Sequence, residues 1–128
     1  MDEPRRILLI RPSALGDVCR SVPVLASLAR AWPEAEVDWL VQDGFADAVR
    51  AHPALTDSIP FPRRELGRAM RSARFGDLRR FTRGLRDRGY DLVIDAQGLF
   101  RSGYLAWASG APRRVGHRAA RELGWLFY

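Results

Sequence analysis

A single carboxylate, Asp17, stands where a chain of this pattern would bind a ligand. It ends the loop Ser13-Ala14-Leu15-Gly16-Asp17, which separates the apolar run Ile7–Ile10 from a helical pattern. A carboxylate there can accept a proton from a substrate as a general base, or it can stabilise the first turn of the helix through the helix dipole. Phosphate binding is a third interpretation, disfavoured because the loop lacks the Walker and Gly-x-Gly-x-x-Gly patterns and its carboxylate repels phosphate. The residues alone leave the first two open.

Arginine is the second chemical signal. Every basic residue of the chain is Arg, and ten of them stand between Arg63 and Arg88 against three carboxylates, a local net charge of +7 in a chain of net charge +6. Such a segment can be a solvated helix face, a nucleic-acid surface, or a site where planar guanidinium groups bind phosphate and carboxylate groups. The segment has no ladder of interleaved aromatic residues, which disfavours nucleic acid.

The elements that would position these residues alternate between strand and helix. Strands are expected at 6–11, 36–41, 57–61, 92–94 and 113–116, of which 6–11 and 92–94 read as buried and 57–61 as a short edge strand. Helices are expected at 17–32 with a kink at Pro23, at 45–51, 79–88 and 99–109, and from 119 onward. This alternation predicts an α/β fold, a Rossmann-like three-layer sandwich with a mostly parallel sheet. Ligands bind at the carboxyl ends of such strands, which places the loops 13–17 and 95–98 at the predicted site. Asp95 is expected either to cap the following helix or to contact substrate.

Composition sets the limits on function. A chain of 128 residues with 47% hydrophobic residues is expected to form one soluble domain, and no apolar run is long enough to span a bilayer. No signal peptide is recognisable and there is one cysteine, Cys19, which indicates a reducing, cytoplasmic compartment. Cys19 is expected to pack as a small apolar residue. His52 and His117 stand apart with no metal-ligand spacing, so neither a metal nor a cofactor is expected.

Several motifs, in order along the chain, resemble glycosyltransferase family 9, the bacterial heptosyltransferases. They cover nearly the whole chain: Ile7–Arg11 with Ser13–Val18 and Val22–Leu25, Asp38–Val41 with Gly44–Ala46, Tyr90–Leu99 with Arg101-Ser102, and Ala120–Leu123 with Leu126–Tyr128. The second and third look more like the enzymes that add the first heptose of lipopolysaccharide than like those that add the second. The resemblance implies a two-domain GT-B fold, of which residues 1–128 would form the N-terminal, acceptor-binding domain without the C-terminal donor domain.

The resemblance also implies a reaction and a set of site residues. Members of the family transfer heptose from ADP-heptose to Kdo–lipid A with inversion, at the cytoplasmic face of the inner membrane, and the family's general base matches Asp17. The residues that match acceptor-binding positions are Ser13, Ala14, Leu15, Gly16, Arg63, Arg64, Gln97, Arg101 and Arg121. Glu65, Leu66 and Gly67 depart from the basic or aromatic residues of relatives, so Arg68 or Arg71 is a candidate substitute for the missing contacts.

Alternatives remain beside the transferase. The chain can be a non-catalytic binding module for an anionic glycolipid or nucleic acid, although no nucleic-acid partner is expected. Within the family it can be a heptosyltransferase II or another member. The expected partners are the Kdo–lipid A acceptor, ADP-heptose through the missing donor domain, and an anionic membrane surface attracted by the arginines of 79–88. The 128 residues alone are expected to be inactive.

Overall fold

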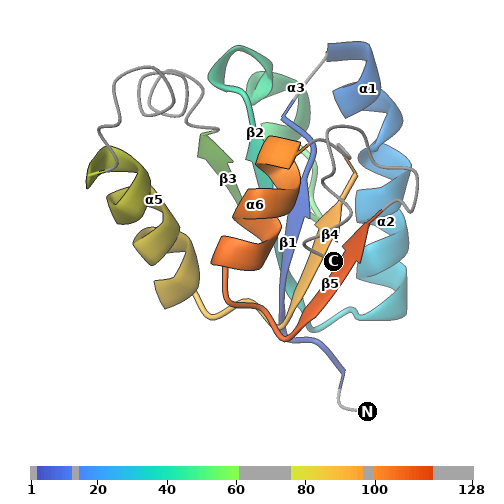
Figure 1. The fold of residues 1–128 in the computed structure, drawn as a ribbon. Coiled ribbons are helices and arrows are strands. Elements are labelled where there is room, and N and C mark those ends of the chain that lie inside the picture. The colour runs from blue at the N-terminus through green and yellow to red at the C-terminus, as the bar shows by residue number, and fades with distance from the viewer. Residues whose placement is uncertain (1–2, 13–14, 61–75, 97–99, 117–128) are drawn as a thin grey trace.

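The computed structural model describes residues 3–12, 15–60, 76–96 and 100–116 (Figure 1). Five strands alternate with helices, as the sequence predicts. In chain order the elements are β1 (Arg6–Ile10), α1 (Leu15–Arg20), α2 (Val22–Ala31), β2 (Glu36–Val41), the 3-10 turn η1 (Asp43–Phe45), α3 (Asp47–Arg50), β3 (Asp57–Pro60), α5 (Gly76–Asp87), β4 (Leu92–Asp95), α6 (Phe100–Ala108) and β5 (Arg113–Gly116).

The strands form one parallel sheet in the order β3-β2-β1-β4-β5. The central strand β1 pairs with β2 on one side and with β4 on the other, and Ile7 to Ile10 have no exposed surface. The strand order therefore reverses direction at β1, the point where such sheets hold their ligands. This topology confirms the predicted fold class.

Two layers of helices cover the sheet (Figure 1). On one face α1, α2 and α3 pack over Ile7, Leu9 and Trp39. On the other face α5 and α6 pack over Leu8, Ile10 and neighbouring strand residues. Alternate residues of β1, β2 and β4 thus enter separate cores, which explains why these strands are rich in apolar residues on both faces. Among the helices that the structure describes, none is long and apolar enough to cross a membrane.

The first helical segment differs from the sequence prediction. One helix with a kink at Pro23 was expected, but the chain forms two helices that separate at Ser21. Pro23 has no N–H and its ring clashes with the carbonyl of Cys19, so α2 instead begins at Val22 with proline in its first turn, where the missing N–H costs nothing. The prediction for Cys19 was also wrong: its side chain is exposed on the short helix α1.

At the amino edge of the sheet, a buried carboxylate joins neighbouring segments by hydrogen bonds. Asp38 in β2 is only 2% exposed and accepts a hydrogen bond from the Tyr90 hydroxyl at 2.6 Å. Arg88 donates to Asp38 at 3.3 Å and to Asp57 of β3 at 3.4 Å. Burial and the hydrogen bond to Asp38 raise the pKa of Tyr90, which keeps the phenol protonated as a donor. The turn before β4 is thereby fixed to β2 and β3.

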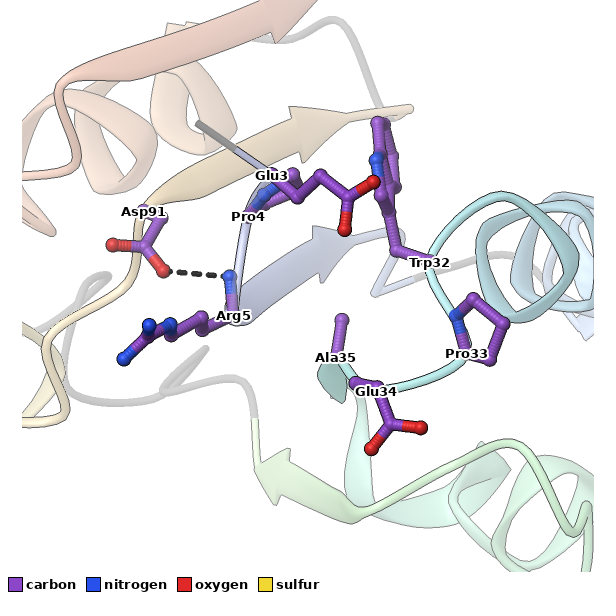
Figure 2. Close-up of a pocket in the computed structure, with 8 residues that line it drawn as sticks. All are labelled: Glu3, Pro4, Arg5, Trp32, Pro33, Glu34, Ala35 and Asp91. Carbon is purple, nitrogen blue, oxygen red and sulfur yellow. Dashed lines mark hydrogen bonds between the residues drawn. The ribbon is translucent and has the colours of Figure 1, made fainter. Parts of the chain in front are cut away.

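A second carboxylate, Asp91, fastens the chain entering β1. Its Oδ2 accepts hydrogen bonds from the backbone N–H groups of Arg5 at 2.8 Å and Arg6 at 3.0 Å, and these bonds lower the pKa of Asp91. Asp91 and Arg5 are among the residues that line an open hollow of about 590 Å³, drawn in Figure 2. The hollow is lined by Glu3, Pro4, Arg5, Trp32, Pro33, Glu34, Ala35 and Asp91. It lies at the amino edge, opposite the ends at which parallel sheets bind ligands.

Replacing Tyr90 by Phe should destabilise the fold, because it leaves the buried Asp38 without its shortest hydrogen bond. We expect the free energy of unfolding to fall by about 1–3 kcal/mol, measured by urea denaturation. Arg50→Gln, which removes an exposed ion pair with Asp47, should change it by less than about 0.5 kcal/mol. Equal effects of the two substitutions would contradict the structural role of the Tyr90 hydroxyl.

Replacing Asp91 by Ala should lower stability in a pH-dependent way. Because the folded pKa lies below the ordinary value of 3.8, the contribution of Asp91 is complete at neutral pH and is lost as the pH falls from 3.8 through the folded pKa. We expect a loss of about 1–2 kcal/mol at pH 7, with the variant and the wild type converging in acid. Denaturation curves at pH 7 and at several acid pH values measure this. A difference in the free energy of unfolding that stays constant with pH would show that the ionised carboxylate of Asp91 does not contribute to stability.

Candidate functional site

The candidate site lies at the carboxyl edge of the sheet, between the loops that follow β1 and β4. The two strands remain paired to their ends, with Ile10 opposite Asp95. The N–H of Ala96 donates to the carbonyl of Ile10 at 2.9 Å, so the chain leaves both strands side by side. Asp95, the last residue of β4, is 2% exposed. Whether Asp95 caps α6 stays a prediction, because residues 97–99 are outside the described part of the chain.

Asp17 lies in the first turn of α1 and faces this edge. Its neighbour Val18 has no exposed surface and anchors α1 on the sheet, while the side chain of Asp17 is 43% exposed. The Ser21 hydroxyl donates to the backbone carbonyl of Asp17 at 2.9 Å and closes the end of the short helix. A half-exposed carboxylate on an anchored turn can meet both the protein and an incoming ligand.

Arg11 connects the two loops. It is the first residue after β1, and its Nη2 lies 3.0 Å from Oδ2 of Asp17. Its other terminal nitrogen, Nη1, donates to the backbone carbonyl of Ala96, directly after β4. The Arg11 side chain is 18% exposed, whereas Arg20, which lies 3.7 Å from Oδ1 of the same carboxylate, is 84% exposed. The well-shielded ion pair of Asp17 is therefore the one with Arg11.

The main chain of Arg11 is held as firmly as its side chain. Its N–H donates to the carbonyl of Leu40 at 3.2 Å, and its own carbonyl accepts from Nε1 of the buried Trp39 at 3.1 Å. Both partners belong to β2. Strands β1, β2 and β4 thus all contribute to the position of one guanidinium group.

The structure places some of the predicted site residues and not others. Leu15, Gly16 and Asp17 form the first turn of α1. Arg101 is the second residue of α6, the helix that follows β4, so its backbone starts from the same edge of the sheet. Six predicted acceptor-binding residues lie outside the described residues: Ser13, Ala14, Arg63, Arg64, Gln97 and Arg121. The roles assigned to all of these residues stay predictions.

Arg11 is the site residue that the sequence analysis missed. Arg11 is included there in the strand 6–11 and in the motif Ile7–Arg11 but is assigned no role in the site. A signal was present, because an arginine directly after a fully buried central strand enters the ligand crevice of a parallel sheet. The residue that it reaches, Ala96, is 85 positions away, so only the sheet register shows the contact.

Metal binding has no support among the residues that can be placed. Within these ranges no three His, Cys, Asp or Glu side chains come together in a way that could hold an ion. Nδ1 of His52 accepts a hydrogen bond from the N–H of Ala54 at 3.1 Å, a local contact that shapes the turn after α3. His117 lies outside the described residues.

Comparisons with known proteins agree on one family. Residues 78–128 match the model of glycosyltransferase family 9 (heptosyltransferase). Lipopolysaccharide heptosyltransferase 1 of Pseudomonas aeruginosa is 45% identical over 96% of this chain and 36% of its own length. The enzyme of the same name from Escherichia coli K12 is 36% identical over 96% of this chain and 40% of its own. The chain therefore spans a little over a third of the length of the curated relatives that it matches.

Solved structures agree in fold. The E. coli heptosyltransferase WaaC with ADP-2-deoxy-2-fluoro heptose superposes with a TM-score of 0.77 at 34% identity, over 96% of this chain and 40% of that one. E. coli ADP-heptose lipopolysaccharide heptosyltransferase II, at 24% identity, shares the fold with a TM-score of 0.76. Residues 78–128 thus match glycosyltransferase family 9, the heptosyltransferases, and 96% of the chain is similar in sequence and fold to proteins of that name.

Proposed function

We propose that this chain is the acceptor-binding part of a heptosyltransferase that transfers heptose from ADP-heptose to Kdo–lipid A, with Asp17 as general base. One observation carries the proposal: a half-exposed carboxylate stands at the point where the strand order reverses, held by a shielded arginine. A carboxylate that served only the helix dipole would not need such a partner. The relatives named above supply the reaction class.

The proposed chemistry is a single displacement with inversion. The acceptor hydroxyl oxygen attacks the anomeric carbon of heptose, and the bond from that carbon to the diphosphate breaks on the opposite side, so that ADP leaves with the electron pair. The hydroxyl proton passes to the carboxylate of Asp17. A carboxylate is far too weak a base to ionise a sugar hydroxyl in advance, so the proton moves as the new bond forms.

The donor side of this reaction requires residues beyond this chain. The relatives are more than twice as long, and the solved WaaC structures contain ADP or a fluorinated ADP-heptose. We assign the ADP-heptose site to a second domain, as the family resemblance implies. On the acceptor side, we propose that the acceptor is bound by the residues that match the family's acceptor-binding positions, among them Arg63, Arg64, Gln97, Arg101 and Arg121.

Asp17→Asn in the full-length protein should abolish turnover. Removing a general base lowers kcat by about 10²–10⁴-fold, while acceptor binding should stay within about threefold because the amide keeps the shape of the side chain. Release of ADP from ADP-heptose in the presence of Kdo–lipid A measures kcat, and equilibrium binding measures acceptor affinity.

Asp47→Asn is the matched control for this experiment. Asp47 also lies in a first helical turn and also pairs with an arginine three residues on, at 3.2 Å, but away from the crevice on α3. It should leave kcat within about twofold. Wild-type turnover by Asp17→Asn would overturn the base assignment. Acceptor binding without any transfer by the wild type would favour the binding module, and transfer only to an acceptor that already carries one heptose would favour heptosyltransferase II.

The same proposal includes a location at the cytoplasmic face of the inner membrane, where the lipid acceptor would be met. Its support is the outer face of α5. Leu78, Phe81 and Leu85 turn inward to the second core, as the sequence predicts. Four arginines of this helix are exposed: Arg79, Arg80, Arg83 and Arg86. This face, the α5 arginine face, would attract anionic headgroups.

Vesicle binding tests this location. Each arginine near an anionic surface contributes about 1 kcal/mol, so replacing Arg79, Arg80 and Arg83 by Gln should weaken binding to phosphatidylglycerol vesicles about 100-fold. The matched control replaces Arg20, Arg30 and Arg50, three exposed arginines on the opposite helical layer, and changes the net charge equally. Sedimentation with anionic and neutral vesicles measures both. Equal losses in the two triple variants would show that net charge acts without a defined face.

A further inference from the structure

Among the described residues at the carboxyl edge, Arg11 is a largely shielded charge, 18% exposed, to which neither the family resemblance nor the sequence analysis assigns a role. We propose that Arg11 is a positioning residue that fixes the carboxylate of Asp17 relative to the β4 loop, so that one carboxylate oxygen is held by the protein and the other is presented to the acceptor hydroxyl. This inference rests on the proposed function of Asp17. It assigns no contact between Arg11 and substrate.

The two terminal nitrogens of the Arg11 guanidinium group contact different loops. Nη2 meets Oδ2 of Asp17 at 3.0 Å, while Nη1 donates to the carbonyl of Ala96. Two rigidly linked nitrogens therefore join the loop after β1 to the loop after β4. A lysine at this position would keep the charge, but its single nitrogen lacks the planar fork and cannot fix both partners in the same way.

Burial distinguishes Arg11 from the other partner of Asp17. The Arg11 side chain is 18% exposed and its Nε is buried without a hydrogen-bond partner among the described residues, so the group is oriented through its two terminal nitrogens. Arg20 is 84% exposed, and ion pairs at that exposure are screened and hold little geometry. Of these two arginines, Arg11 is the one that can keep the carboxylate in one place.

The backbone of Arg11 gives this arrangement its rigidity. The N–H of Arg11 donates to the carbonyl of Leu40, and the carbonyl of Arg11 accepts from Nε1 of Trp39. These two hydrogen bonds fix the main chain of Arg11 to β2. Oδ2 of Asp17 is held by the shielded guanidinium group of Arg11, whereas Oδ1 has the exposed Arg20 3.7 Å away, so we assign proton transfer to Oδ1. A displacement of about 1 Å at such a group can cost 10²-fold in rate.

The test uses the full-length protein and three substitutions at Arg11. Arg11→Met should lower kcat about 10–100-fold with both KM values within about threefold, because the step and not the binding depends on Asp17. Arg11→Lys should recover less than a tenth of the lost activity. In Arg11→Ala, added guanidinium ion should raise kcat at least fivefold.

Arg20→Met is the matched control. It removes a cation from the same carboxylate but from its exposed side, and we assign Arg20 no part in the site. It should change kcat less than threefold, and Arg20→Ala should not respond to guanidinium. Full activity of Arg11→Lys, or equal losses at Arg11 and Arg20, would overturn the inference, because charge alone would then be sufficient.

A crystal structure of the Arg11→Met variant tests the inference without turnover. We expect the Asp17 side chain to leave its position beside the β4 loop, with the rest of α1 unchanged. A carboxylate that stays in place would overturn the positioning role. If the wild type transfers no heptose, the proposed function fails, whereas a displaced carboxylate in this variant would still support the positioning role.

Discussion

The burial of β1 between two parallel neighbours is the constraint on which the rest of this structure depends. Four consecutive residues of the strand are fully covered, with side chains entering both cores. Both sides of β1 are already paired with neighbouring strands. The chain therefore leaves β1 at the carboxyl edge, between the ends of these two neighbours. The chain on one side passes to β2 through α1 and α2, and β4 occupies the other side. The place of the candidate site is a consequence of this topology, and Arg11 and Asp17 are the first charged residues to follow the strand.

The two edges of the sheet use charge differently. At the amino edge, Asp38 and Asp91 accept hydrogen bonds that connect separate strands, and their oxygens are directed to the protein. At the carboxyl edge, one oxygen of Asp17 pairs with the shielded Arg11 and the other with the exposed Arg20, and the side chain stays 43% exposed. Carboxylates of the first kind stabilise the fold, since their partners would otherwise be left unpaired. The second kind leaves one side of the group available to a ligand.

The sequence predicted the layer architecture and the loop that bears Asp17, because buried parallel strands and amphipathic helices leave strong local patterns. It could not predict what fixes that carboxylate. The contact from Arg11 to Ala96 depends on the register of β1 against β4, and the burial of Asp38 depends on Tyr90 arriving from the turn after α5. Both join residues more than 50 positions apart. The kink expected at Pro23 became a full break, because proline fits the first turn of a new helix, where its missing N–H is not needed.

That break bears directly on the site. It leaves α1 with six residues, and an isolated helix of that length is not stable in water. Its position must therefore come from tertiary contacts, which include the burial of Val18 and the ion pair between Arg11 and Asp17. In a longer continuous helix, the packing of the later turns would also have held Asp17 in place. Here the carboxylate is located by what it touches, so the same ion pair that orders the short helix also sets the geometry of the proposed base.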